Sequence, residues 1–411
     1  MRVAIYTLGC KTNQYETELI RESFEGHGDT VVPFHNKADL YIINSCVVTG
    51  KAEAETRKAV HHAKRTNPNA KIIITSCFAR LRPDFKENDV SLYTGERKKI
   101  ADFYYNNTYS AVSLQEESIK KFSGHTRATV KIEEGCNNFC TYCIVPFVRG
   151  SKIKSKTREI VVKEVQELSK AGYKEIVLSG TEIGKYGEDI GTSLTSLLKT
   201  LKTIEGIERI RISSIYPTAI TDDLIKELSS PVTPHLHISL QSGDNEVLKR
   251  MNRNYTTEEC LNIIEKLRKK DPNFSITTDI IVGFPGETDN AFLNSVSIVG
   301  KAHFSKVHIF RYSKRPFTPA YFMKETVSES LKKTRVERLL HAVNIERTAL
   351  KNRFLNKTVK VLVEEKDGMY YTGFTPYYLK TKFTGTNIEL GSIVPVLVEK
   401  VDANYLYGRS L

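Results

Sequence analysis

The stretch EGCNNFCTYCIVPFVRG (134–150) holds three of the chain's seven cysteines. Cys136, Cys140 and Cys143 follow the spacing C-x3-C-x2-C, and no histidine lies nearby. Structural zinc normally takes four Cys or His ligands, whereas this stretch offers three. Three thiolates suit a four-iron, four-sulfur cluster in which one iron has no protein ligand. Such an iron can bind a substrate directly, as an open metal position does at catalytic sites.

Three more cysteines each end a short apolar run in the first 125 residues. The runs VAIYTLGC, LYIINSC and KIIITSC end at Cys10, Cys46 and Cys77, and each has the β-branched composition of a strand buried on both faces. Helix-like segments follow at 13–28, 50–67 and 83–90. This alternation predicts a parallel sheet, which binds ligands at the carboxyl ends of its strands. We therefore expect the three cysteines to meet at one metal site.

The rest of the chain divides into two further patterns. A polar segment near 113–128 is expected to be a linker. Strand candidates then cover 128–135, 175–180, 209–214, 235–242, 276–286 and 306–313. Amphipathic helical segments separate them, which predicts a complete or partial β/α barrel, and Cys260 is expected to pack inside one of these helices. Beyond residue 355 short alternating strands rich in Tyr and Lys predict a small all-β barrel. The expected domains are 1–120, 126–350 and 351–411.

Composition limits the compartment and the partner. The chain has 411 residues, with 61 basic and 48 acidic side chains, which gives a formal net charge of +13. An excess of this size favours a polyanionic partner such as RNA. No run reaches the roughly 18 apolar residues that a membrane span needs, and MRVAIYTLGC enters a strand-like run without a signal segment. We expect a cytoplasmic protein that contacts no membrane and, with an odd number of cysteines, has no disulfide framework.

The motif C-x3-C-x-aromatic-C after a first barrel strand, preceded by a domain with three separate cysteines, resembles the methylthiotransferase family of radical S-adenosylmethionine enzymes. The resemblance covers nearly the whole chain. It implies an N-terminal methylthiotransferase domain with a parallel α/β sheet, a radical S-adenosylmethionine barrel and a C-terminal TRAM domain. It also implies two 4Fe-4S clusters: a radical cluster held by Cys136, Cys140 and Cys143, and an auxiliary cluster held by Cys10, Cys46 and Cys77.

The resemblance further implies the cosubstrate and the partners. S-adenosylmethionine is expected to be used twice per turnover, once as the source of a radical and once as the methyl donor. The expected partners are an electron donor of the flavodoxin or ferredoxin type and a sulfur donor. The protein is expected to act as a monomer.

Resemblance also places the S-adenosylmethionine site at the ends of the barrel strands. The second, third and fourth strands end in SGTEIG, RISSIYP and SLQSGD. The expected cofactor-binding residues are Tyr142, Gly180, Thr181, Glu182, Ser213, Ser214, Gln241, Ser242, Arg253 and Gly283. Arg253 is a candidate partner for the cofactor carboxylate. The alternatives are a plain strand-to-helix turn with capping roles for Gly180, Thr181 and Glu182, and simple solvation for Arg253.

The substrate is inferred from the N-terminal motif TLGCKTNQYET. This motif most resembles the MtaB-type branch, which implies that a methylthio group is added at carbon 2 of threonylcarbamoyladenosine 37, beside the tRNA anticodon. Thr12 stands where that branch is expected to have Val. The alternatives within the same chemistry are isopentenyladenosine in tRNA, with an expected motif Y-G-C-Q-M-N, and a ribosomal protein aspartate, with L-G-C-P-K-N.

Basic and aromatic residues are expected to contact the RNA. The run RGSKIKSKTR (149–158) follows the cysteine loop and is placed to hold phosphates, although such runs are usually solvated faces. Aromatic and lysine side chains of the last domain suit stacking on loop bases. The expected RNA-binding residues are Arg149, Lys152, Lys154, Lys156, Arg158, Tyr377, Lys380 and Lys382. A competing function from another class is a non-catalytic RNA-binding protein stabilised by zinc.

Overall fold

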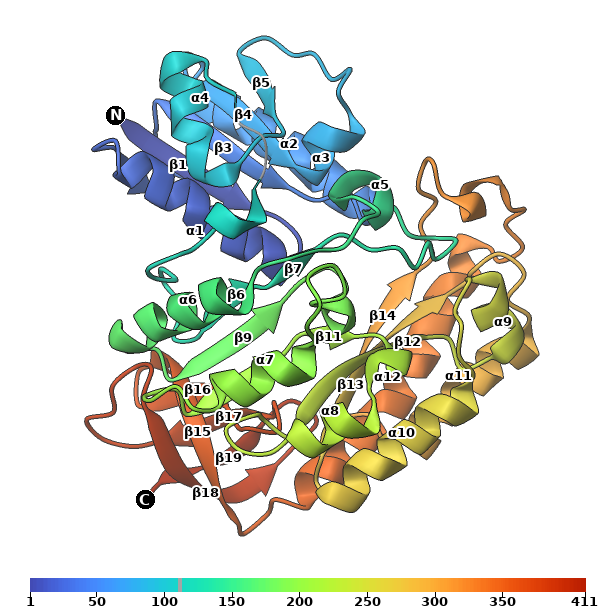
Figure 1. Ribbon diagram of the computed structural model, residues 1–411. Coiled ribbons are helices and arrows are strands. Elements are labelled where there is room, and N and C mark those ends of the chain that lie inside the picture. Colours follow the sequence, from blue (N-terminus) through green and yellow to red (C-terminus); the bar gives the residue numbers. More distant parts are fainter. Residues whose placement is uncertain (110–112) are drawn as a thin grey trace.

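The structure is a computed structural model that describes residues 1–109 and 113–411. It comprises an N-terminal α/β part, a central arc of parallel strands covered by helices, and a C-terminal β-barrel (Figure 1). The predicted fold class is confirmed, and the central barrel is of the partial kind. In the described part of the chain, no helix is long and apolar enough to cross a membrane.

The N-terminal part is a parallel sheet with the strand order β2-β1-β3-β4-β5. Its strands are β1 (Arg2–Thr7), β2 (Thr30–Val32), β3 (Leu40–Ser45), β4 (Lys71–Ser76) and β5 (Val90–Tyr93). Its helices are α1 (Lys11–Glu25), α2 (Gly50–Thr66), α3 (Cys77–Leu81) and α4 (Ile100–Asn106). Every residue of β3 is buried because α2 and α3 pack on one face of the sheet and α1 and α4 on the other. The helix expected at 83–90 is wrong, since the chain there forms turns and the helix after β4 is α3.

The central part is an arc of parallel strands in two hydrogen-bonded sheets, β6-β9-β10 and β11-β12-β13-β14. The strands are β6 (Ala128–Lys131), β9 (Glu175–Ser179), β10 (Arg209–Ile212), β11 (Ser214–Ile215), β12 (His235–Gln241), β13 (Ser275–Val282) and β14 (Lys306–Arg311). The helices are α6 (Arg158–Lys170), α7 (Leu194–Leu201), α8 (Asp222–Glu227), α9 (Asn245–Arg250), α10 (Thr257–Lys270), α11 (Asp289–Ala302) and α12 (Glu329–Asn352). Alternate apolar residues of the strands pack outward against these helices in one large core.

Two short strands and a short helix follow β6 and carry the cysteine loop. They are β7 (Glu133–Glu134), β8 (Lys154–Ser155), antiparallel to it, and α5 (Val145–Arg149). The segment expected to be a linker is partly interior: Ile119 and Phe122 are buried, and the Ile119 N–H donates to Glu164 of α6 at 2.9 Å. Sparse apolar residues among polar neighbours made this segment look like a linker.

The C-terminal part is a closed barrel with the strand order β15-β16-β17-β19-β18. Its strands are β15 (Thr358–Asp367), β16 (Tyr370–Phe374), β17 (Lys380–Thr384), β18 (Ile393–Val401) and β19 (Leu406–Ser410). Tyr371 and Phe383 fill its core, while their neighbours in sequence face outward. The barrel packs beneath the arc, where the Arg209 and Arg211 guanidinium groups donate to carbonyl groups of β15 and of the turn after β16.

Candidate active site

The cysteine loop between β7 and α5 surrounds its thiols with backbone donors. Cys136 and Cys140 are buried and Cys143 is partly buried. The backbone N–H groups of Asn138 and Val145 face the sulfurs of Cys136 and Cys143, respectively, and favour their thiolate forms. Burial raises the pKa of Cys136 to about 11 and that of Cys143 to about 12, and these N–H groups offset part of the rise. We name these three cysteines the barrel set.

The other three cysteines, here named the N-terminal set, lie at the carboxyl ends of adjacent strands. Cys10, Cys46 and Cys77 follow β1, β3 and β4, which are neighbours in the sheet. The Val48 N–H donates to the Cys46 sulfur, whose pKa burial raises to about 11. Gly9 packs so closely that a Cβ there would lie 2.9 Å from the Cys46 Cβ and 3.0 Å from its sulfur. The strand order therefore places these cysteines along one edge of the sheet, and their meeting at one metal site stays a prediction.

The backbone beside both sets has a shape that suits an iron–sulfur cluster. Among residues 1–109 and 113–411, no group of three or more His, Cys, Asp or Glu side chains is close enough together to hold a metal ion as it stands. The residue before each of four cysteines has a positive φ: Gly9, Ser76, Gly135 and Phe139. Backbone of this kind helps to form the anion-binding concavities found at many iron–sulfur sites.

A cavity of about 240 Å³ lies between the barrel set and the loop after Cys46. It is lined from the barrel side by Tyr142, Cys143, Ile144, Gln241, Asp279, Ile281, Phe310, Arg311, Tyr312 and Ser313, and from the N-terminal part by Val48 and Thr49. Val48 and Thr49 stand two and three residues after Cys46, so the cavity borders one cysteine of the barrel set and the loop that follows one cysteine of the N-terminal set. Its size suits part of a small molecule or a single base.

Buried acceptors without partners lie beside the barrel set. Glu133 accepts the N–H of Glu182, and a Cβ at Gly180 would lie 2.1 Å from the Glu133 carboxylate. Within the described part of the chain, one carboxylate oxygen of Glu133, one of Glu182 and the hydroxyl of Ser213 find no hydrogen-bond partner. Burial raises the pKa of both glutamates. Orphaned acceptors of this kind suit an ammonium or ribose hydroxyl groups, so they fit S-adenosylmethionine. Glu133 is not among the residues expected from the sequence, although it belongs to an acidic pair just before the cysteine motif.

Arg253 is interior rather than solvated. Its guanidinium donates to the Cys140 sulfur at 3.2 Å, to the Tyr255 hydroxyl at 2.8 Å and to the Ser239 hydroxyl at 3.0 Å. It also lies 4.1 Å from the ring centre of Tyr216. A cation held against a cluster cysteine is well placed for a cofactor carboxylate.

The other expected cofactor residues are spread more widely. Tyr142 and Gln241 line the cavity, and Gln241 has a positive φ of 75°. Ser214 is exposed, whereas the Ser242 hydroxyl is buried and accepts the N–H of Asp244 in its own loop. A Cβ at Gly283 would lie 2.4 Å from Lys332 of α12, so helix packing accounts for that glycine.

The basic run after the cysteine loop is only partly on the surface. Lys152, Lys154 and Arg158 are exposed, but the expectation of a surface position is wrong for Arg149 and Lys156. Lys156 donates to Glu164 and to Tyr15 at 2.7 Å each. Arg149 pairs with Glu16, Glu134 and Asn13 and lies beside the Cys77 thiol. Sequence composition cannot show that these two basic residues are buried, because their partners come from distant segments of the chain.

The expected contacts of the last domain differ in exposure. Tyr377 is half-buried against Phe354, with ring centres 5.0 Å apart, and so faces the junction with α12. Lys380 and Lys382 are partly exposed and lie over the rings of Tyr405 and Tyr370.

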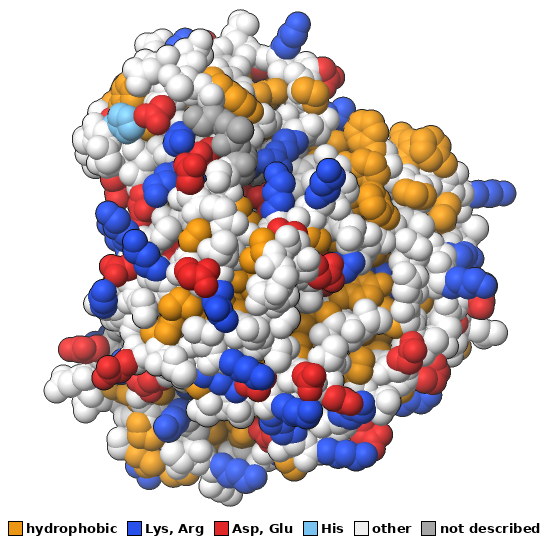
Figure 2. Space-filling model, viewed as in Figure 1, with side chains coloured by type: hydrophobic (Ala, Val, Ile, Leu, Met, Phe, Trp, Pro, Cys, Tyr) orange, Lys and Arg blue, Asp and Glu red, His pale blue; other side chains and the backbone are white. Residues whose placement is uncertain are grey.

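Exposed aromatic rings border the cavity. We name as the aromatic patch Phe139, Phe147, Phe310, Phe317, Tyr321 and Phe322, which are 41–82% exposed. Phe310 lines the cavity, and the rings of Phe147 and Phe317 lie 6.2 Å apart. Figure 2 shows hydrophobic side chains gathered over α5 and the loop after β14, with Lys and Arg side chains beside them. Contiguous exposed apolar surface of this kind marks an interaction site.

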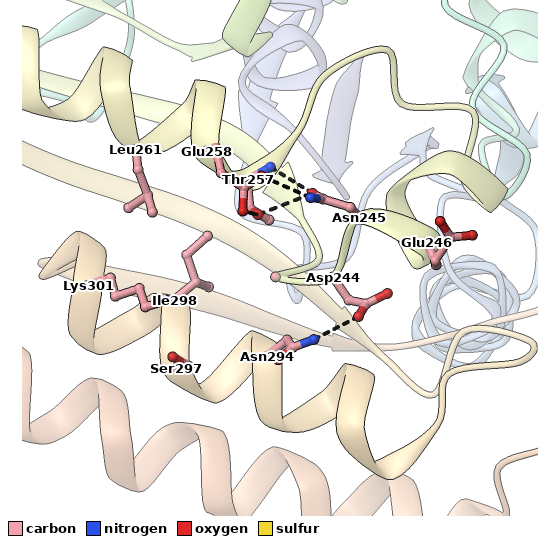
Figure 3. A pocket seen from close by; sticks show the side chains of 11 residues that line it. Asp244, Asn245, Glu246, Thr257, Glu258, Leu261, Asn294, Ser297, Ile298 and Lys301 are labelled. Carbon is pink, nitrogen blue, oxygen red and sulfur yellow. Dashed lines mark hydrogen bonds between the residues drawn. The ribbon is translucent and has the colours of Figure 1, made fainter.

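A second cavity, of about 270 Å³, lies away from both cysteine sets, between α9, α10 and α11 (Figure 3). Its polar groups are already paired: Asp244 accepts from Asn294, and Asn245 bonds with Thr257 and Glu258. Acidic side chains outnumber basic ones in its lining, which disfavours anionic ligands. It therefore does not compete with the cysteine-bordered cavity as the site.

Comparison with known proteins agrees with this geometry. Residues 130–298 match the Radical SAM superfamily, and residues 2–92 match the Uncharacterized protein family UPF0004. The threonylcarbamoyladenosine tRNA methylthiotransferase MtaB of Thermotoga maritima is 43% identical over 94% of this chain and 92% of its own length. The MtaB protein of Bacillus subtilis is 39% identical over 99% and 96%. A tRNA-2-methylthio-N(6)-dimethylallyladenosine synthase of Clostridium novyi is 35% identical over 99% and 96%.

A solved structure resembles the fold alone. The radical S-adenosylmethionine methyltransferase TsrM of Kitasatospora setae matches with a TM-score of 0.58 and 12% identity, covering 78% of this chain and 76% of that one.

Proposed function

The chain belongs to the threonylcarbamoyladenosine tRNA methylthiotransferases of the MtaB type, and on that premise we propose how it acts. It is a radical S-adenosylmethionine enzyme that converts threonylcarbamoyladenosine 37, beside the tRNA anticodon, to its 2-methylthio derivative. One observation carries this proposal: a single cavity is lined by Cys143 and by the residues that follow Cys46. A cavity between the two cysteine-bearing loops is what insertion of sulfur into an unactivated C–H bond requires, because the radical and the sulfur must meet at the same carbon.

The cysteines hold the metal clusters in this proposal. The barrel set binds the 4Fe-4S cluster of the radical reaction, and the N-terminal set binds a second 4Fe-4S cluster. S-adenosylmethionine and the clusters supply the radical and sulfur chemistry that no side chain can supply. The protein contributes binding, orientation and shielding from water.

Individual residues hold S-adenosylmethionine by charge and shape. Arg253, fixed against Cys140, pairs with its carboxylate. The free acceptors of Glu133, Glu182 and Ser213 take its ammonium and hydroxyl groups. Tyr142 stands in the cavity wall and supplies an apolar face for its adenine.

Surface features around the cavity mouth support an anticodon loop as the partner. The aromatic patch offers rings for unpaired bases, whose stacking is worth about 1–3 kcal/mol each. Lys152, Lys154 and Arg158 offer exposed positive charge after the cysteine loop. The C-terminal barrel adds Lys380 and Lys382.

The reaction needs partners beyond tRNA. We propose that two molecules of S-adenosylmethionine are used per turnover, that a flavodoxin or ferredoxin supplies electrons and that a separate donor supplies sulfur. The protein is proposed to work as a monomer in the cytoplasm.

Nucleoside mass spectrometry tests this function. Transfer RNA from a strain that lacks the gene should contain threonylcarbamoyladenosine without its 2-methylthio form, and complementation should restore that form. Loss of the isopentenyl counterpart instead would keep the chemistry and overturn the substrate. No change in any methylthioadenosine would overturn the proposed function.

A further inference from the structure

The inner face of the strand arc is polar, although its outer face is apolar. Along each strand, the side chains between those of the packed core point inward, and several of them form hydrogen bonds to side chains of a neighbouring strand. His235 and His237 contact the Thr277 hydroxyl at 3.1 and 3.0 Å, and His237 contacts Asp279 at 3.2 Å. The ring of Tyr378 lies against that of His235 at the start of β12, with ring centres 4.8 Å apart. Asp279 also lines the cysteine-bordered cavity, so the polar face continues into the site.

Lys11 reaches this inner face from the N-terminal part. It is the first residue of α1 and follows Cys10 directly. The start of α1 lies on the arc, since the Thr12 hydroxyl is 3.5 Å from that of Ser179 at the end of β9. Lys11 is partly buried at this junction. Burial lowers the pKa of His235 of β12 and of His308 of β14, and the positive charge of Lys11 adds to the effect on both. Together with the contact at Ser179, this indicates that Lys11 lies toward the inner face of the arc.

The amine of Lys11 has no carboxylate beside it. Among the residues that the structure describes, no hydrogen bond acts on this amine, and the charge of Glu175 has only a minor effect on it. Glu175 is engaged by Arg209 and Arg211, and Asp279 by His237. Lys11 is nevertheless only partly exposed. An interior cation without a counter-ion is costly, which favours a ligand that brings a carboxylate.

We propose that Lys11 binds the carboxylate of the threonylcarbamoyl group and thereby selects the substrate. The inference rests on the proposed function, in which the substrate base carries one carboxylate and S-adenosylmethionine another. The structure offers a separate cation for each. Arg253 touches Cys140 of the barrel set, where S-adenosylmethionine binds, whereas Lys11 is joined to Cys10 of the N-terminal set, from which sulfur reaches the base.

Binding measurements test this assignment without turnover. The reconstituted holoenzyme, kept anaerobic and without reductant, is titrated with two anticodon stem-loop RNAs. One carries threonylcarbamoyladenosine and the other its carboxyl methyl ester. The wild-type protein should prefer the free acid by about tenfold to a hundredfold, as expected for a charge-assisted hydrogen bond. Lys11→Gln should bind both RNAs as the wild type binds the ester, and Lys11→Arg should recover part of the preference.

A matched control removes the same charge elsewhere. Lys71 begins β4 at the amino end of the strands, opposite the end where the cysteines lie, and it pairs with Asp89. Lys71→Gln should therefore keep the full preference for the free acid. Iron content and thermal midpoint show that each variant is folded. Equal binding of the two RNAs by the wild type, or an undiminished preference in Lys11→Gln, would overturn the proposal. Weaker S-adenosylmethionine binding in Lys11→Gln with the RNA preference intact would overturn it too. The nucleoside assay on the unaltered strain reports separately on the proposed function.

Discussion

Cys260 and Cys136 are both buried. Their surroundings differ, as expected for a cysteine that only packs in the core and one that is a candidate metal ligand. Cys260 is fully buried within α10, as expected, and burial raises its pKa to about 12. Cys136 follows a glycine of positive φ, and the backbone N–H of Asn138 favours its thiolate. Amide groups near sulfur tune iron–sulfur sites. This backbone difference is what we expect between a ligand cysteine and a packing cysteine.

Replacing each cysteine set by alanine should remove one cluster. After anaerobic reconstitution, the variant of Cys136, Cys140 and Cys143 should retain about four irons and lose reductive cleavage of S-adenosylmethionine. The variant of the N-terminal set should also retain about four irons but still cleave S-adenosylmethionine without forming the methylthio product. Iron and sulfide assays with product analysis measure both.

Cys260→Ala is the control for these variants. It removes a buried thiol that has no expected ligand role, so about eight irons should remain. Retention of eight irons by the variant of the N-terminal set would refute the assignment of the second cluster to these three cysteines.

At the scale of elements, the aromatic patch is formed by the cysteine loop, α5, the end of β14 and the loop after β14. Phe317→Ala and Phe322→Ala should each weaken tRNA binding by about fivefold to a hundredfold, because stacking on a base is worth about 1–3 kcal/mol. Both side chains are largely exposed, so stability should change by less than about 0.5 kcal/mol. Filter binding or fluorescence anisotropy measures the affinity. Ile345→Ala, at an exposed position of α12, should leave the affinity unchanged. Equal losses at Ile345 would show that the patch has no special role.

The junction of α12 with the C-terminal barrel should respond to pH through Lys351. Its amine is buried and donates to the Ala403 carbonyl at 2.9 Å. Burial, assisted by Arg347, lowers its pKa from 10.5 to about 8. Between those pH values the unfolded chain binds more protons than the folded one, so the free energy of unfolding rises with pH.

The substitution Lys351→Met isolates this effect. From about pH 8 to about pH 10, wild-type stability should rise relative to the variant by up to roughly 2–3 kcal/mol, given 1.36 kcal/mol per pKa unit. Urea unfolding followed by circular dichroism at both pH values measures the difference. A difference that stays constant with pH would contradict the assigned shift.

At the scale of the whole molecule, buried charges join the N-terminal part to the barrel. Arg149 and Lys131 from the barrel side surround Glu16 of α1, together with Arg97. Burial raises the pKa of Glu134, but Lys131 and Arg149 bring it down to about 2. The same Arg149 lies beside Cys77 and Asn13, so one side chain ties the two cysteine-bearing segments together.

Arg149→Gln should therefore destabilise the protein strongly. It leaves Glu16 and Glu134 buried with fewer cations, which costs about 3–5 kcal/mol for a broken buried pair. Arg158→Gln, which removes an exposed arginine paired only with Glu159, should cost less than about 1 kcal/mol. Denaturant unfolding of the apoprotein measures both. Equal stability of the two variants would show that the buried pairs contribute little.

Local patterns predicted much of the fold and part of the site. Strand runs that end in Cys10, Cys46 and Cys77 predicted the sheet edge where they lie, because neighbouring parallel strands share one carboxyl edge. The cysteine loop and the strand–helix alternation predicted the barrel in the same way. Segments with weak periodicity were interpreted less well: 83–90 is not helical, and 113–128 packs partly inside.

The sequence by itself determined the six cysteines in two sets, the order of strands and helices, and the family. These depend on residue spacing and periodicity, which are local along the chain. Only the tertiary structure decided which charges face inward. Arg149 is interior because Glu16, 133 residues away, meets it, and Lys11 faces the arc because α1 lies against β9. Whether a charged side chain is buried depends on partners that folding brings from distant parts of the chain, and local sequence does not identify those partners.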